Sequence, residues 1–357
     1  MKRQLVVFAW LALSGSGLLA PTVHSAQETN WTELNLAVTD PHVIPAYERF
    51  SAAAGALVPA AAGLCSQPND ESLASMQVAF HAAMDQWQGI QHVQFGPVTY
   101  FNWNFRLEYW PDERNTGSRQ LDVVLAAQDR ALLESASFER QSVGVQGFPA
   151  LEQLLFGENA LSLLQQQPYR CDVLQAIAAN ISTIATGIHT RWLDEFRASI
   201  ANADERKSFE NAQDATIEFY KALVETIRKD QQQKLEAVLG ASFAEARVRR
   251  AESWRSERSL RNIKMNVATL AELFDGSVPA LSSALLPADS AKVRAGFATL
   301  QATLAAQPDS MTALLQTEAG YTQLVSVRDQ MNALFELLEA SLKNTDLYLG
   351  FNSLDGD

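Results

Sequence analysis

The sequence predicts an all-α protein built from two helical-bundle domains packed side by side. Nearly every long segment after residue 40 spaces its apolar residues by three and four, and no segment alternates apolar and polar residues as a strand does. The predicted helices are roughly 20 to 35 residues long with short connections, which favours up-and-down packing. The chain has 357 residues, 47% of them hydrophobic, and is too long for a single four-helix bundle.

The N-terminal segment, residues 1–26, has the pattern of a secretory signal peptide. Lys2 and Arg3 precede an apolar run over residues 5–20, and small residues follow up to Ala26. The run is short and contains Gly and Ser, so we expect cleavage rather than a membrane anchor, and no transmembrane segment afterwards. Cleavage lowers the formal net charge from −13 to −15. Such an acidic chain repels phosphate backbones, so nucleic acid is not an expected partner.

Helical periodicity predicts the elements that follow. The expected helices cover residues 43–64, 72–91, 118–133, 169–202, 209–239, 243–274, 288–306 and 310–342. Pro59 interrupts the first of them and Gly240 ends the fifth. An irregular aromatic segment, residues 95–115, lies between the second and the third.

The charged break at residues 202–208 predicts the boundary between the two domains. The N-terminal bundle then covers residues 27–204 and includes the aromatic segment. The C-terminal bundle covers residues 205–357.

The chain contains two cysteines, Cys65 and Cys171. In an exported protein a disulfide between them is permitted, and it would close a long loop and stabilise the fold. We expect this bridge rather than two separate buried thiols. Two cysteines are also too few for a Cys-rich metal site.

The stretch GFPALEQLLFG, residues 147–157, has the features of a helix start. Pro149 suits the first turn because its missing N–H needs no partner there, and Gly147 permits a tight entry. Glu152 is near the positive end of the helix dipole, and Gly157 ends the helix.

Four pieces of the sequence, in order, resemble the imelysin family of exported bacterial proteins. They are residues 45–65, 95–115, 147–157 and the tail 349–357. Within the second piece Arg106, Trp110 and Asp112 fall in the family's Arg-x-x-x-Trp-Pro-Asp pattern. The resemblance implies a periplasmic or outer-membrane-facing protein of two helical domains that is associated with iron acquisition.

The namesake members of the family were described as metallopeptidases, with the signature Gly-x-His-x-x-Glu. Gly147 and Glu152 match this signature, but Pro149 stands at the histidine position. A catalytic zinc usually needs about three protein ligands, and Glu152 alone does not supply them. The cofactor therefore stays open: a divalent metal or iron held by carboxylates is one possibility, with Glu152 as the best single ligand.

The four histidines outside the signal peptide do not complete a metal motif. They are His42, His81, His92 and His189, and none begins a His-x-x-Glu or His-Glu-x-x-His pattern. We expect each to be a surface residue or a hydrogen-bonded structural residue.

Two further groups of side chains have alternative interpretations. In one interpretation of the aromatic segment, Arg106 binds a carboxylate or pairs with Glu152, and Trp110 lines a pocket. In the other, the segment is a packed, irregular connection. Arg250, Arg255, Arg258 and Arg261 follow one another along the predicted helix 243–274, and this basic stripe either pairs internally or binds an anion.

We therefore expect a non-catalytic exported protein that binds a ligand or ion in a cleft between the domains. The cleft is predicted around Arg106, Trp110, Asp112 and Glu152, and the function is accessory to bacterial iron uptake, with iron-uptake or envelope components as partners. The expected location is the periplasm or the outer membrane. Two alternatives remain: a metallopeptidase with a rebuilt metal site, and an envelope protein-interaction module.

Overall fold

The structure is a computed structural model, and it describes residues 29–203 and 208–347. Over these ranges all regular secondary structure is helical, so the all-α prediction is confirmed. The predicted signal peptide, residues 1–26, and the tail 349–357 lie outside the described residues.

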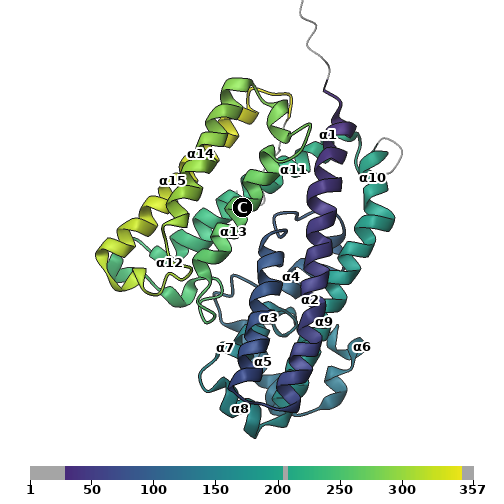
Figure 1. Ribbon diagram of the computed structural model, residues 1–357, viewed down its shortest axis with the longest axis vertical. Coiled ribbons are helices and arrows are strands. Elements are labelled where there is room, and N and C mark those ends of the chain that lie inside the picture. The colour runs from purple at the N-terminus through teal and green to yellow at the C-terminus, as the bar shows by residue number, and fades with distance from the viewer. Residues whose placement is uncertain (1–28, 204–207, 348–357) are drawn as a thin grey trace, which may run out of the picture.

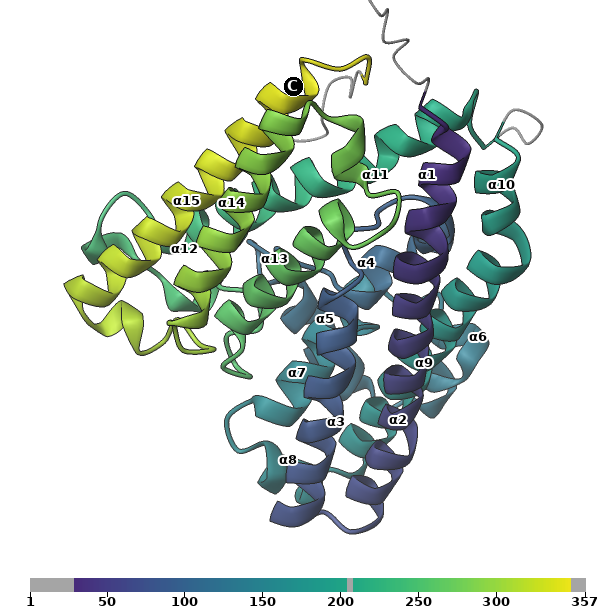
Figure 2. The same cartoon turned by 45° about the horizontal axis from the view of Figure 1, so that its top comes forward.

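The helices form two groups that lie side by side (Figures 1 and 2). The first group is centred on three long helices, α2 (Ile44–Ser66), α3 (Asp70–Gln88) and α9 (Pro168–Arg191), with α2 packed between the other two. Its shorter members are α4 (Trp103–Leu107), α5 (Thr116–Ala127), α6 (Ser135–Phe138), α7 (Phe148–Phe156) and α8 (Ala160–Gln166). A π-helical turn continues α9 into α10 (Arg197–Ala201).

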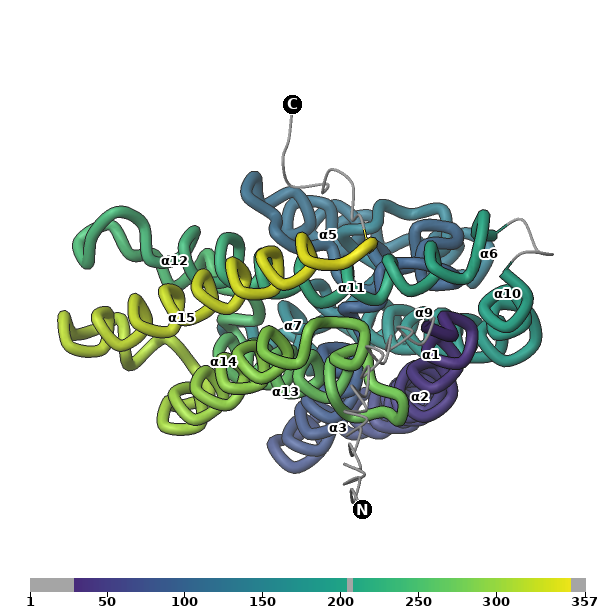
Figure 3. The backbone as a smooth tube through the Cα atoms, turned by 90° about the horizontal axis from the view of Figure 1, so that it is seen from above, coloured from purple at the N-terminus to yellow at the C-terminus, as the bar shows by residue number. Residues whose placement is uncertain are grey.

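The second group contains four long helices and one short one. They are α11 (Ala212–Lys229), α12 (Ala237–Leu239), α13 (Ser259–Asp275), α14 (Pro287–Ala305) and α15 (Glu318–Leu342). The helix α14 packs on α13 and α15, and α15 also packs on α11. Figure 3 shows α14 and α15 on the side of the molecule opposite to α2, α9 and α10.

Contacts from α1 and α13 join the two groups. The helix α1 (Trp31–Val38) precedes α2 in the chain but packs against α11, and α13 packs against α3. The helix α11 begins after residues 204–207, which lie outside the described residues, so the domain boundary near residue 204 stays a prediction.

Capping side chains explain where several helices begin. Asn69 and Ser72 form a reciprocal capping box at α3, and Asn211 and Asp214 form another at α11. Pro168 is the first residue of α9, where its missing N–H has no partner to lose.

The structure corrects three expected elements. The helix α2 runs through Pro59, which lies on its exposed side, because buried residues such as Leu57 and Leu64 hold both halves against the core. The predicted helix 243–274 begins only at Ser259. The predicted helix 310–342 begins only at Glu318, where the Thr317 side chain accepts a hydrogen bond from the N–H of Gly320 and caps α15.

A disulfide joins Cys65 at the end of α2 to Cys171 in the first turn of α9. The two Cα atoms are 5.4 Å apart, and 106 residues separate the cysteines in sequence. A covalent link over so long a loop constrains the unfolded chain strongly.

The helical stretch Pro168–Ala201 is long and apolar enough, by length and composition, to cross a membrane. In this fold 56% of its most apolar part is buried inside the protein, where it packs against α2 and α7. Core helices of globular proteins meet the same criterion.

Candidate functional site

A cavity of about 920 Å³ lies between the two helix groups. The first group contributes the segment after α4 and the start of α7, including Trp110, Asp112 and Glu152. The second group contributes Gln232 and the loop before α13, residues 249–255. The volume suits a small-molecule site, which commonly lies where two domains meet.

The helix α7 positions Glu152 at this cavity. Gly147 is its N-cap and Pro149 is its second residue, so the proline lacks only an N–H that no helical carbonyl requires. A side chain at Gly147 would collide with the backbone carbonyls of Arg106 and Leu107. This close approach requires glycine, independently of any metal motif.

Glu152 is buried, with 5% of its surface exposed, and Ser256 from the opposite group holds it. Its Oε1 accepts hydrogen bonds from the Ser256 backbone N–H at 2.9 Å and from Oγ at 2.6 Å. Burial raises the pKa of Glu152, and the two Ser256 bonds offset part of that rise. The other oxygen, Oε2, accepts no hydrogen bond within the described part of the chain.

Asp112 and Trp110 line the same cavity as Glu152. The Asp112 carboxylate accepts hydrogen bonds from the N–H groups of Thr116 and Gly117, both at 2.7 Å. Its charge therefore stabilises the first turn of α5.

Arg106 does not line the cavity, which corrects the expectation that it faces the cleft or pairs with Glu152. Its guanidinium is buried in the first group, where Nε donates to Gln146 Oε1 at 2.7 Å and an Nη donates to Asn180 Oδ1 at 3.0 Å. Burial lowers the pKa of Arg106. Its position is that of a packing residue that joins α4 to α9.

A fully buried polar cluster lies beside the cavity, and the sequence did not predict it. Its centre is Lys234, whose Nζ is 2.9 Å from Glu252 Oε2 and 3.4 Å from Asp230 Oδ1. The same Nζ donates to Gln88 Oε1 at 3.0 Å and to Asn266 Oδ1 at 2.7 Å. We call these residues the Lys234 cluster.

The acids in and beside the Lys234 cluster have shifted pKa values. Burial, together with the charge of Glu252, raises the pKa of Glu108 to about 8, although Trp87 Nε1 donates to its Oε2 at 2.6 Å. Burial likewise raises the pKa of Asp230 to about 6. Burial would also raise the pKa of Glu252, but Lys234 outweighs it and the pKa is lowered. Glu108 and Glu252 both line the cavity.

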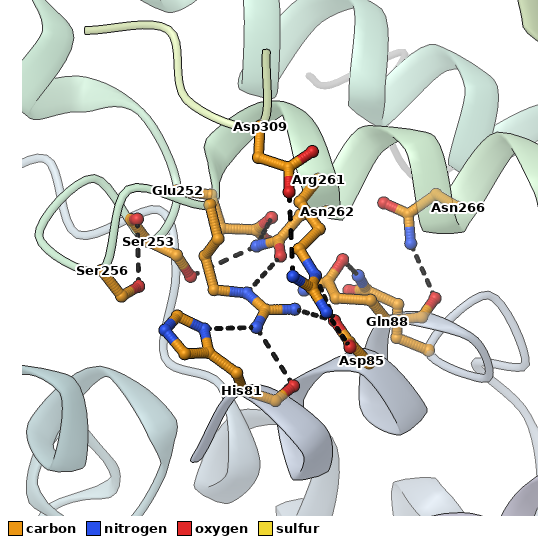
Figure 4. A network of polar contacts seen from close by, with 12 residues as sticks. His81, Asp85, Gln88, Glu252, Ser253, Ser256, Arg261, Asn262, Asn266 and Asp309 are labelled. Atoms are coloured by element: carbon orange, nitrogen blue, oxygen red, sulfur yellow. Dashed lines mark hydrogen bonds and ion pairs between the residues drawn. The ribbon is translucent and has the colours of Figure 1, made fainter. Parts of the chain in front are cut away.

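A second polar cluster joins the groups through Asp85 on α3 (Figure 4). Asp85 Oδ1 accepts from Arg258 at 2.6 Å and from Arg261 Nε at 2.9 Å. Arg258 also donates to the backbone carbonyl of His81 at 3.1 Å and to Asn262 Oδ1 at 2.8 Å. We call these residues the Asp85 cluster.

The predicted basic stripe is therefore divided. Arg258 and Arg261 pair internally with Asp85, which is one of the two expected outcomes. Arg250 and Arg255 line the cavity together with Arg249. The division arises because residues 249–258 form an irregular loop whose polar side chains Glu252 and Ser256 point inward.

The histidines form no metal site in the described ranges. His42 and His92 are buried in the first group with their Nε2 atoms 3.1 Å apart, and burial lowers both pKa values. His81 contacts Arg258. Residues 29–203 and 208–347 contain no group of three or more His, Cys, Asp or Glu side chains arranged to hold a metal ion.

Part of this site was detectable in the sequence. Asp230 and Lys234 are four residues apart within a predicted helix, which places them on one face. Glu108, Glu252 and Ser256 had no comparable signal, because nothing in their spacing indicates that they meet across the two groups.

The fold and the cavity define a class: an all-α protein whose two helix groups enclose a polar cavity. The family model described as Imelysin (Peptidase_M75) matches residues 43–341. The chain therefore belongs to the imelysin family. No curated protein matches the chain significantly.

Two solved structures have a similar fold. One is an imelysin-like protein from Psychrobacter arcticum, with 20% identity and a TM-score of 0.74 over 90% of this chain and 97% of that one. The other, from Parabacteroides distasonis, is named an iron-regulated protein A precursor. It has 14% identity and a TM-score of 0.74 over 89% of this chain and 97% of that one. At these identities the likeness concerns the fold.

Proposed function

We propose that this protein is a non-catalytic member of the imelysin family that binds a small ligand in the cavity between its helix groups. One observation supports this most directly. Pro149 replaces the signature histidine, and Oε1 of the signature glutamate, Glu152, accepts two hydrogen bonds from Ser256. A zinc peptidase needs about three ligands and an open position for water. Glu152 has no second ligand within reach on its own helix.

We further propose export to the periplasm or the periplasmic face of the outer membrane, and a role accessory to iron uptake. The pattern of residues 1–26 supports export, and so does the Cys65–Cys171 disulfide, since such bonds persist in oxidising compartments. The role in iron uptake rests on the family resemblance and on the name of the Parabacteroides relative. Iron-uptake or envelope proteins are the proposed partners.

Metal analysis with a peptidase assay tests the non-catalytic proposal. The mature chain is purified, dialysed against buffer without chelator, and analysed for metal by mass spectrometry. A peptide-library assay is then run with and without EDTA. We expect less than a tenth of an equivalent of zinc or iron (about 0.1 per chain) and no chelator-sensitive cleavage.

One equivalent of zinc together with EDTA-sensitive cleavage would establish the metallopeptidase alternative and overturn the proposal. A second assay addresses the envelope-module alternative. If no small ligand changes the melting temperature and an envelope protein co-purifies with the chain at equal stoichiometry, the cavity is not the functional site.

A further inference from the structure

The wall of the cavity contains three arginines from one loop. Arg249, Arg250 and Arg255 all line the cavity, and none forms an ion pair with a carboxylate of the described residues. Arg258 and Arg261, from the same basic stretch, are both paired with Asp85. In a chain with a net charge of −13, three unpaired cations on one cavity wall are the feature that needs explanation.

Trp254 holds two of these arginines in place. The Arg255 Cζ lies over the Trp254 ring at 4.6 Å from its centroid, and the Arg249 Cζ lies over it at 5.5 Å. A guanidinium over an aromatic face is attracted through its own face, so its N–H groups in the plane stay available to a ligand. Such N–H pairs match the two oxygens of a carboxylate or a phosphate.

The cavity wall also contains hydrogen-bond donors other than the arginines. Besides the arginines, the indole N–H groups of Trp110 and Trp254 donate to no acceptor of the described residues, and both rings line the cavity. The two indoles add planar apolar surface beside the guanidiniums.

Five acids line the same cavity: Glu108, Asp112, Glu113, Glu152 and Glu252. Glu113 is exposed to solvent, and the other four oppose an anion less than their number implies. Glu108 has a pKa near 8 and keeps its proton at neutral pH. Glu252 is neutralised by Lys234, and the Asp112 carboxylate is bonded to two backbone N–H groups. Glu152 is 95% buried and lines the cavity, and its Oε2 has no hydrogen-bond partner among the described residues. A protonated Glu108 would donate a further hydrogen bond to a ligand oxygen.

We propose that the cavity binds a small organic anion that has a carboxylate on a planar, apolar body. The carboxylate is bound by Arg249 and Arg255, and the planar body packs against Trp254 and Trp110. This inference rests on the proposed ligand-binding function and specifies the ligand class for the same cavity.

A matched pair of probes tests the inference. Benzoate has the carboxylate and the planar ring, and benzamide has the same ring without the charge. Binding to the purified full chain is measured by ligand-observed NMR titration. We expect a Kd on the order of 1 mM for benzoate, since so small a ligand gains only a few favourable contacts. Benzamide should bind about tenfold more weakly or worse.

Single variants identify the groups responsible. Arg255→Gln and Arg249→Gln should each weaken benzoate about tenfold, because each removes a charge-assisted pair of hydrogen bonds. Trp254→Leu should weaken it about threefold to tenfold. Arg140→Gln is the control, because Arg140 is exposed, has no ion pair with the described residues and does not line the cavity. Circular dichroism and the melting temperature verify that each variant is folded.

Equal binding of benzoate and benzamide, or benzoate binding that is unchanged in both arginine variants, would overturn the inference. Inorganic phosphate and citrate are run in parallel. If phosphate binds as tightly as benzoate and Trp254→Leu changes the affinity for neither, the ligand does not need a planar, apolar body, and that part of the inference is overturned. If no anion binds, and the chain holds no zinc and cleaves no peptide, the ligand class is wrong but the non-catalytic proposal stands. EDTA-sensitive cleavage would overturn the non-catalytic proposal, whether or not an anion binds.

Discussion

The Lys234 cluster and the Asp85 cluster both join the two helix groups through charged side chains, but they differ in burial. In the Asp85 cluster the acid accepts several hydrogen bonds from Arg258 and Arg261 and retains some exposure. In the Lys234 cluster the Asp230 oxygens accept no hydrogen bond from the described residues, and Lys234 is 1% exposed.

This difference gives Asp85 and Asp230 pKa shifts of opposite direction. Burial alone would raise the pKa of Asp85, but Arg261 and Arg258 outweigh it and the pKa is lowered. The pKa values of Asp230 and Glu108 are raised, since burial, together with the charge of Glu252, exceeds the effect of Lys234 and Lys229. The hydrogen bonds from two arginines therefore stabilise the ionised form of Asp85. In the fully buried Lys234 cluster, the stability of the fold depends on every charged partner being present.

Lys234→Met should have the largest effect on stability. The variant leaves Asp230 and Glu252 buried without the lysine charge that faces them, and breaking a buried pair in this way costs about 3 to 5 kcal/mol. The free energy of unfolding is measured by urea titration at pH 7. Lys292→Met is the control, because Lys292 is 62% exposed in its side chain and, among the described residues, pairs only with Asp289. A change below that of the control would show that the buried acids are already neutral.

Arg258→Met should rank second. Its guanidinium is 1% exposed and donates to Asp85, Asn262 and His81, so the change removes several charge-assisted hydrogen bonds. We expect a loss of about 2 to 4 kcal/mol in the urea titration. If Arg258→Met costs more than Lys234→Met, the order of the two clusters is reversed.

Glu108→Gln should change the pH dependence of stability. The folded pKa of Glu108 is raised to about 8 from 4.5, so the folded chain holds an extra proton between those values. Stability is then present at low pH and falls as the pH rises from about 4.5 to 8. The glutamine removes this loss, and at pH 8 it should make the variant about 3 kcal/mol more stable relative to wild type than at pH 5. Parallel pH profiles for the two proteins would contradict the shift.

Arg261→Met should have the smallest effect. Its side chain is 39% exposed and Asp85 keeps its bonds to Arg258, so the loss is about 1 kcal/mol or less. Because the pair is at the surface, the loss should shrink further in 1 M NaCl. A salt-independent loss above about 2 kcal/mol would place Arg261 with the buried residues.

The sequence by itself determined most of the fold. The apolar spacing of residues 169–202 and 209–239 is dense enough to specify long helices, and the structure has helices there from Pro168 and Ala212 onward. The same local chemistry explains α7, where Gly147 and Pro149 open the helix and Glu152 follows one turn later. Such features depend on neighbouring residues and are visible along the chain.

Tertiary structure alone decided the site. The helical period of residues 243–258 is overridden because Glu252 and Ser256 are bonded to Lys234 and Glu152, partners that are distant in sequence. For the same reason Arg106 packs inside the first group while Arg249 and Arg255 face the cavity. A polar side chain bonds to the nearest suitable partner in space, and the sequence does not show which residues the packing of two helix groups will bring together.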